Sequence, residues 1–296
     1  MNYKALQEKV TNKIIKELEA GDTAPWLKMW AGDGVAKNIK SGATYQGFNQ
    51  LILGIAGFDS AYWLTFKQCE ALGGKVKKGS KGTQIAYASS YNKTTENSDG
   101  TTSERSLAFM RVYTVFNVEQ CDGIEAPKEG LERVKGAGKN ALIDAFVENT
   151  GAKVQMSNKA CYIPSIDVIK MPPKSHWNDT DSYYSTLAHE LTHWTGEKDR
   201  LDRLDLKNKK GYAFEELVAE FGNAFLCKQF NIAPEARHAG YLKSWLEALK
   251  NDYTYLPKAA AQAGKAHVYL NKLQNKEEKP TLATQASQPK QLGLIA

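Results

Sequence analysis

The sequence is poor in the side chains that crosslink proteins or bind soft metals. Its 296 residues include only 4 cysteines, Cys69, Cys121, Cys161 and Cys227, and none of them forms a C-x-x-C pair. Isolated cysteines of this kind are typical of reduced thiols buried as small apolar side chains. We therefore expect neither a disulfide framework nor a zinc–thiolate site.

Long apolar stretches are absent as well. The sequence has no run of about 18 apolar residues, so it predicts no transmembrane helix. Residues 1–5 lack the apolar segment of a signal peptide. We expect a cytoplasmic protein with no membrane partner.

The rest of the composition is that of an ordinary folded protein. Hydrophobic residues make up 42% of the chain and charged residues 24%, and this length suggests two domains. Helical and strand patterns are both present, so we expect an α+β class. The net charge of +6 permits a polyanionic partner. The predicted parts are a domain at 1–125, a linker at 126–135, a domain at 136–275, and a disordered tail at 276–296.

One short motif points to a metal site. His189, Glu190 and His193 form the pattern H-E-x-x-H in a stretch free of Pro and Gly. On a helix, residues four apart lie on one face, so both imidazoles can bind one ion, zinc or another divalent metal. Glu190 then stands where the general base of a metal hydrolase belongs. The alternative is a pair of hydrogen-bonded helical histidines beside a solvated glutamate.

The third ligand is expected on a second buried helix, at residues 214–226. This segment carries Glu216 and Glu220 four residues apart on one face. One of them can bind the metal while the other orients a ligand histidine. We favour Glu216 because it resembles the E-x-x-x-D arrangement of gluzincins, with Glu220 as the alternative. Tyr212, just before this pair, either stabilises an oxyanion or packs in the core.

A strand is predicted shortly before the metal-binding helix, at residues 166–171. Pro172 and Pro173 end it, and we expect them to keep it at a sheet edge. An edge strand above the metal would let an extended peptide substrate add to the sheet.

The first half contains two candidate surfaces for nucleic acid. Trp26, Trp30 and Lys40 lie in an irregular stretch, where the rings either stack on bases or close a core edge. Residues 67–81 contain five Lys and one Glu, with glycines that let the backbone approach phosphates. Such a charged run is either a solvated loop or, beside Trp63, a site for nucleic acid. The lysines chosen from this run are Lys75, Lys77, Lys78 and Lys81.

Two strands are predicted at residues 84–89 and 107–118. The polar, Gly/Ser/Thr-rich residues 92–106 between them predict a long mobile hairpin loop.

Several of these blocks together resemble the ArdC antirestriction family, over about residues 1–275. The first-half blocks are similar to its N-terminal domain, and the second-half blocks to its C-terminal zincin-like domain. The blocks are residues 63–68, 73–79, 113–120, 167–172, 189–196 and 216–220.

The resemblance implies an N-terminal α+β domain that binds single-stranded DNA and is shared with some plasmid primases. It implies a C-terminal metallopeptidase domain of the SprT or gluzincin kind, with helices and a small antiparallel sheet. Its metal residues carry over as His189, His193 and either Glu216 or Glu220, with Glu190 as the base. Such proteins protect plasmid DNA from host restriction during conjugation.

Three functions remain open from the sequence. The first is a DNA-binding zinc peptidase that acts on a host protein. The second is a non-enzymatic single-stranded-DNA shield with a structural or vestigial metal site. The third, a peptidase independent of DNA, is weakened by the N-terminal blocks.

Overall fold

The computed structural model describes residues 2–21, 25–26, 34–96, 102–127, 137–205, 208–234 and 239–274. Most of the expected linker, the expected tail and Trp30 therefore lie outside the described residues. The described helices include none that is long and apolar enough to cross a membrane.

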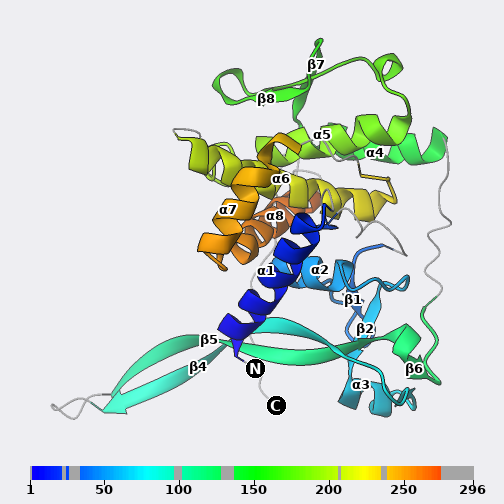
Figure 1. Cartoon of the computed structure of the whole chain (residues 1–296), viewed down its shortest axis with the longest axis vertical. Coiled ribbons are helices and arrows are strands. Elements are labelled where there is room, and N and C mark those ends of the chain that lie inside the picture. Colours follow the sequence, from blue (N-terminus) through cyan, green and yellow to red (C-terminus); the bar gives the residue numbers. More distant parts are fainter. Residues whose placement is uncertain are drawn as a thin grey trace, which may run out of the picture.

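The N-terminal half combines a mixed sheet with short helices (Figure 1). The strand order is β1-β2-β5-β4, with β1 parallel to β2 and the other pairs antiparallel. Strands β3 and β6 form a separate two-stranded sheet. Thr65 and Gln68 form a reciprocal capping box that starts α3. The elements are α1 (Tyr3–Glu19), β1 (Lys37–Asn38), α2 (Gly47–Gly54), β2 (Tyr62–Thr65), α3 (Phe66–Ala71), β3 (Lys75–Val76), β4 (Thr83–Glu96), β5 (Thr102–Asn117) and β6 (Cys121–Asp122).

Strands β4 and β5 form a long ribbon that projects from the body of the molecule (Figure 1). Their pairing is continuous from Thr83 opposite Val115 to Glu96 opposite Thr102. The predicted loop at 92–106 is therefore wrong over most of its length. Backbone pairing between strands needs no apolar side chains, and threonine is a good strand former.

The C-terminal half is mainly helical, with a small sheet above the helices (Figure 1). The strand order is β7-β9-β8, with β7 parallel and β8 antiparallel to β9. The α+β class is thus confirmed, although this sheet is mixed rather than wholly antiparallel. The elements are α4 (Ala137–Thr150), β7 (Lys153–Met156), β8 (Cys161–Ile163), β9 (Val168–Met171), α5 (Thr180–Trp194), α6 (Lys209–Phe230), α7 (Leu242–Asn251) and α8 (Tyr255–Lys272).

The predicted edge strand is the central strand of this sheet. β9 has a partner on each side, and the edges are β7 and β8. Pro172 follows the last paired residue, Met171, so its missing N–H removes no ladder bond and does not keep the strand at an edge.

One hydrophobic core joins the two halves of the chain. Leu6 and Ile14 of α1 and Leu51 of α2 belong to the same buried cluster as Phe221 of α6 and Trp245 of α7. Helices α2 and α8 also cross very closely. A Cβ on Gly264 would lie 2.7 Å from the backbone of Gly47, so only glycine fits there. The two predicted domains therefore share this core, although each half also has buried clusters of its own.

Candidate metal centre

The centre forms where α5 packs against α6. Asp179 caps α5 by accepting a hydrogen bond from the Ser182 N–H at 2.7 Å. A side chain at Gly222 of α6 would collide with Thr192 of α5. This glycine lets the helices approach closely, and the histidines of one helix then face the glutamates of the other.

Three side chains converge at this contact. The Nε2 atoms of His189 and His193 lie 3.0 Å apart. One carboxylate oxygen of Glu216 lies 3.6 Å from His189 Nε2, and the other lies 3.5 Å from His193 Nε2. Ligand atoms about 2.0–2.1 Å from a tetrahedral zinc lie about 3.3–3.4 Å from one another. The three side chains, of which His189 and Glu216 are buried and His193 is partly buried, therefore fit one metal ion, with a fourth position available for water or substrate.

A carboxylate also lies behind each histidine. Glu220 Oε1 is 3.6 Å from His189 Nδ1, and Glu215 Oε1 is 3.1 Å from His193 Nδ1. The two alternatives for the third ligand thus occupy different places. Glu216 faces the Nε2 atoms, whereas Glu220 is on the Nδ1 side of His189, where a carboxylate orients a ligand imidazole.

The Glu215 carboxylate behind His193 is also paired with an arginine. Arg203 donates to both carboxylate oxygens of Glu215, with both distances 2.9 Å. Burial alone would raise the pKa of Glu215, but the hydrogen bonds from His193 and Arg203 outweigh it and hold that pKa below its usual value. Burial likewise would lower the pKa of His193, yet Glu215 and neighbouring glutamate charges raise it.

Sequence reasoning missed Glu215, Arg203 and the role of Trp26. Glu215 directly precedes Glu216, and an acid in a buried helix requires a partner, so this signal was present. Trp26 gave no such signal: its indole N–H donates to Glu220 Oε2 at 3.5 Å from a segment far away in sequence.

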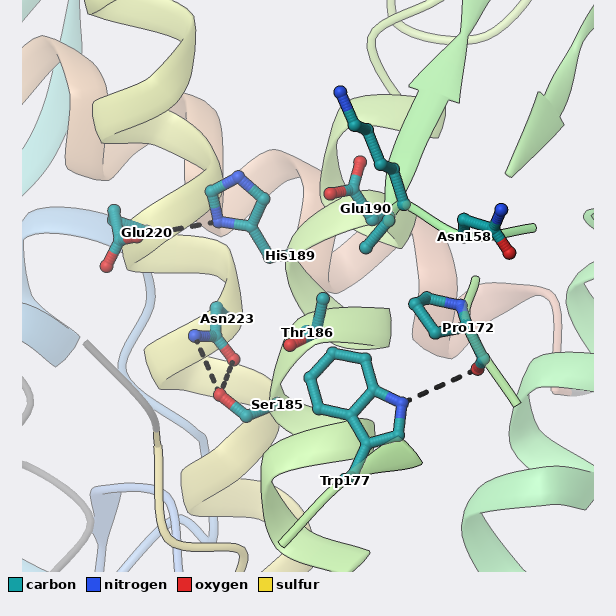
Figure 2. A pocket seen from close by; sticks show the side chains of 11 residues that line it. Asn158, Pro172, Trp177, Ser185, Thr186, His189, Glu190, Glu220 and Asn223 are labelled. Atoms are coloured by element: carbon teal, nitrogen blue, oxygen red, sulfur yellow. Dashed lines mark hydrogen bonds and ion pairs between the residues drawn. The ribbon is translucent and has the colours of Figure 1, made fainter. Parts of the chain in front are cut away.

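A cavity of about 400 Å³ lies beside His189 and Glu190 (Figure 2). Trp177 also lines this cavity, and its indole N–H donates a hydrogen bond to the Pro172 carbonyl. Glu190 Oε2 accepts a hydrogen bond of 2.7 Å from the backbone N–H of Tyr162. The strand edge beside α5 at the metal centre is thus that of β8, whereas it was expected to be that of β9.

Tyr212 lies one helical turn before Glu216. It is 41% exposed, and its hydroxyl bonds Glu216 and Tyr241. Burial and the charge of Glu216 both raise the pKa of Tyr212, so the hydroxyl keeps its proton at neutral pH. It is a donor at the rim of the centre rather than a core residue.

The predicted base-stacking tryptophans are buried. Trp26 is 0% exposed and packs against Phe221 and Trp245. Trp63 is 2% exposed and packs against Phe58. Neither ring can stack on a base in this structure, so these two predictions are wrong and the packing alternative holds. Trp30 lies outside the described residues.

The predicted lysines all lie at the surface. Those from the glycine-rich run surround the small β3–β6 sheet, although Lys77 also donates to the Glu119 carbonyl at 2.8 Å. The exposed lysines are Lys40, Lys75, Lys77, Lys78 and Lys81.

Family models match both halves of the chain. Residues 141–262 match the zincin-like metallopeptidases, and residues 4–116 match the N-terminal domain of anti-restriction factor ArdC. Together with the histidine–glutamate cluster, the first match defines the C-terminal half as a zincin-like metallopeptidase domain.

Solved structures extend the likeness to nearly the whole chain. The metal-free antirestriction protein ArdC of plasmid R388 is 38% identical, with a TM-score of 0.77 over 90% of this chain and 97% of that one. Its Mn(II)-bound form is 37% identical, with a TM-score of 0.74 over 92% and 99%. The chain belongs to the ArdC antirestriction family, and the Mn(II)-bound relative supports a divalent metal at this centre.

A longer relative also matches. The DNA primase TraC of Escherichia coli is 35% identical over an alignment 312 residues long, which covers 97% of this chain. The chain spans only 29% of the length of that protein.

Proposed function

We propose that this protein binds single-stranded DNA and hydrolyses a host protein at a zinc centre, and so protects incoming plasmid DNA from restriction. The observation that carries the proposal is the cluster of His189, His193 and Glu216, with a carboxylate behind each imidazole. Two imidazoles and one carboxylate are the ligand set of a catalytic zinc site that keeps one position open. Glu216 is the proposed third ligand, and Glu220 orients His189.

The residues around the centre have distinct roles in hydrolysis. The bound metal would polarise a peptide carbonyl and make the attacking water more acidic. Glu190 takes a proton from that water and passes it to the leaving amine. Tyr212 donates a hydrogen bond to the developing oxyanion from the rim. Trp177 and residues 158–160 enclose the substrate chain.

Surface charge supports the DNA partner. Lys40, Lys75, Lys78 and Lys81 are exposed in the N-terminal half, and lysine–phosphate contacts give affinity for any sequence. The solved relatives are named as antirestriction proteins and one longer relative as a DNA primase. Both names describe proteins whose function involves DNA, which supports DNA as a partner of this protein.

The variant Glu190→Gln tests whether hydrolysis is needed. Glutamine keeps an oxygen for the Tyr162 N–H but cannot accept the proton, so hydrolysis should fall about 10²–10⁴-fold. Metal content and DNA affinity should remain, and both can be measured directly. Conjugation into restricting and non-restricting hosts then compares wild type, Glu190→Gln and the His189→Ala, His193→Ala variant.

The comparison uses the full chain because the largest of the buried clusters contains residues of both halves. Loss of protection with Glu190→Gln supports the peptidase. Full protection by both variants would instead establish the alternative, a DNA shield whose metal site is structural or vestigial. Candidate host proteins incubated with and without single-stranded DNA would identify the substrate.

A further inference from the structure

A second cavity, of about 680 Å³, lies between the halves of the chain. Strand β4 forms one wall, helix α8 the other, and the start of α2 the floor. Its size is within the range of about 300–1,000 Å³ that is typical of ligand sites. None of the described residues that line it also lines the cavity at the metal centre.

The lining of this groove has a distinct chemistry. Aromatic rings come from Tyr3, Phe48, Tyr87 and Tyr269. The charged residues that line it, within the described parts of the chain, are two lysines of α8, Lys265 and Lys272. They are exposed and seven residues apart, and hence lie on one face of the helix about 10 Å apart along its axis.

The floor of the groove is bonded to one wall and packed tightly against the other. Asn49 of α2 clamps Ala86 of β4 through two hydrogen bonds of 2.6 and 2.9 Å between its amide and the backbone. On the other side, Gly47 and Gly264 hold α2 against α8. Helix α2 thus connects the two walls of the groove.

An exposed row of aromatic side chains lies on the face of the ribbon opposite Ala86, Ala88 and Met110. Tyr87, on the edge strand β4, belongs both to this row and to the groove lining. Cross-strand partners share a face, so Tyr87 and Arg111 stand beside Tyr113 and Phe109. The Tyr87 and Tyr113 rings are 6.2 Å apart, and the Arg111 guanidinium lies 4.9 Å from the Phe109 ring centre. Tyr87 is 60% exposed and Tyr113 is 40% exposed.

Such a row is unusual on a surface without a ligand. Single exposed apolar residues are common, but a contiguous group of rings beside cations marks a binding site. Rings and arginine planes offer stacking surfaces to any base, and lysines neutralise phosphates. An acidic peptide could also pair with the lysines, but it would not provide bases to stack on the row of rings.

We propose that single-stranded nucleic acid follows the row of Tyr113, Tyr87, Arg111 and Phe109, passes around the edge strand β4 at Tyr87 and enters this groove. Its bases stack on Tyr87 and the neighbouring rings, and its phosphates contact Lys265 and Lys272. The DNA path therefore crosses from the N-terminal half onto α8 of the zincin-like half. This inference rests on the proposed DNA binding and specifies where it takes place.

The test uses the full-length protein and a fluorescent oligodeoxythymidylate, with affinity measured by anisotropy over a range of salt concentrations. Tyr87→Ala should weaken binding about 5- to 150-fold at every salt concentration, the effect of losing one stacked base. Lys265→Gln with Lys272→Gln should flatten the dependence of log affinity on log salt by about 1.4, or about 0.7 per lost phosphate contact.

A matched control is Lys198→Gln with Lys243→Gln, which removes two exposed lysines of the same half that do not line the groove. It should leave the slope nearly unchanged. Because Tyr87 is mostly exposed, Tyr87→Ala should keep the melting temperature of wild type.

Each other outcome overturns the inference. If the wild type binds the oligonucleotide and both variants, Tyr87→Ala and Lys265→Gln with Lys272→Gln, bind it equally well, the DNA lies elsewhere on the protein. The proposed function would then still stand. If the control variant flattens the salt dependence equally, the effect comes from the net charge of the protein and not from the lysines of the groove. A wild type that fails to bind the oligonucleotide would reject both this path and DNA binding itself.

Discussion

Arg203 holds Glu215 in a two-bond ion pair directly behind the metal-centre histidine His193. Both partners are almost fully buried, and Arg203 also donates to the Thr192 carbonyl and the Thr195 hydroxyl at the end of α5. The pair therefore ties the segment after α5 to α6. It also fixes the Nδ1 side of His193, which leaves Nε2 directed at the metal position.

Glu215→Gln should weaken metal binding about 10- to 100-fold, because the carboxylate that orients His193 is lost. The metal-free protein should also lose about 3–5 kcal/mol of unfolding free energy, since Arg203 is left buried without its counter-charge. Metal titration and denaturant unfolding measure the two effects separately. Glu197→Gln, at a nearby surface position, is the control. Unchanged metal affinity in Glu215→Gln would show that the pair is only structural.

Trp26→Phe should weaken metal binding several-fold. It removes the indole N–H that reaches Glu220, and Glu220 in turn faces His189. Stability should fall by about 1–3 kcal/mol through the cavity that the smaller ring leaves. Trp245→Phe is a matched control, because its ring is equally buried but its N–H bonds the Ala213 carbonyl. If both variants change metal affinity alike, the cause is packing and not the bond to Glu220.

Tyr212→Phe should lower the turnover number of the peptidase about 10²-fold or more, with metal content unchanged, because an oxyanion donor acts mainly in the transition state. The Michaelis constant should change little. Tyr241→Phe removes the neighbouring hydroxyl and serves as control. A turnover number equal to wild type would exclude Tyr212 from catalysis.

His267→Gln should make the protein less sensitive to acid. Burial lowers the pKa of His267 to about 4 in the folded protein, against 6.5 for an ordinary histidine. The stability associated with neutral His267 is thus complete above pH 6.5 and is lost as pH falls toward 4. This loss is about 3 kcal/mol, at about 1.4 kcal/mol per pKa unit.

Unfolding free energies of metal-free wild type and variant between pH 7 and 4 test this prediction. The variant should show a smaller loss over that interval. His176→Gln, at an exposed histidine, should follow the wild-type profile. Parallel profiles for wild type and His267→Gln would show that other groups dominate the acid response.

The metal centre was largely predictable because its information is local. His189 and His193 share a helix, as do Glu216 and Glu220, and helix geometry fixes each pair. The sequence left open which glutamate faces the Nε2 atoms. That choice depends on the close contact at Gly222 between two helices, which no single segment contains.

Non-local contacts account for the errors as well. A tryptophan ring can pack in a core or stack on a base. Trp26 packs against Phe221, and Trp63 lies in a cluster with Ile85 and Val115, which are distant in sequence. Whether β9 is an edge or a centre depends on which strands pair with it. The exposed pair of Tyr87 and Tyr113 was overlooked because its register is visible only once the ribbon is paired.

The core shared by α1, α2, α6 and α7 limits how this architecture can be rearranged by recombination. A breakpoint between the two matched segments would expose large side chains such as Leu51 and Phe221, each worth about 1.5–3 kcal/mol when buried. Both segments also occur together within TraC, where the matched stretch is 29% of a longer protein. Length can thus be added outside this pair of segments, whereas a cut between them would leave large apolar side chains exposed on both pieces.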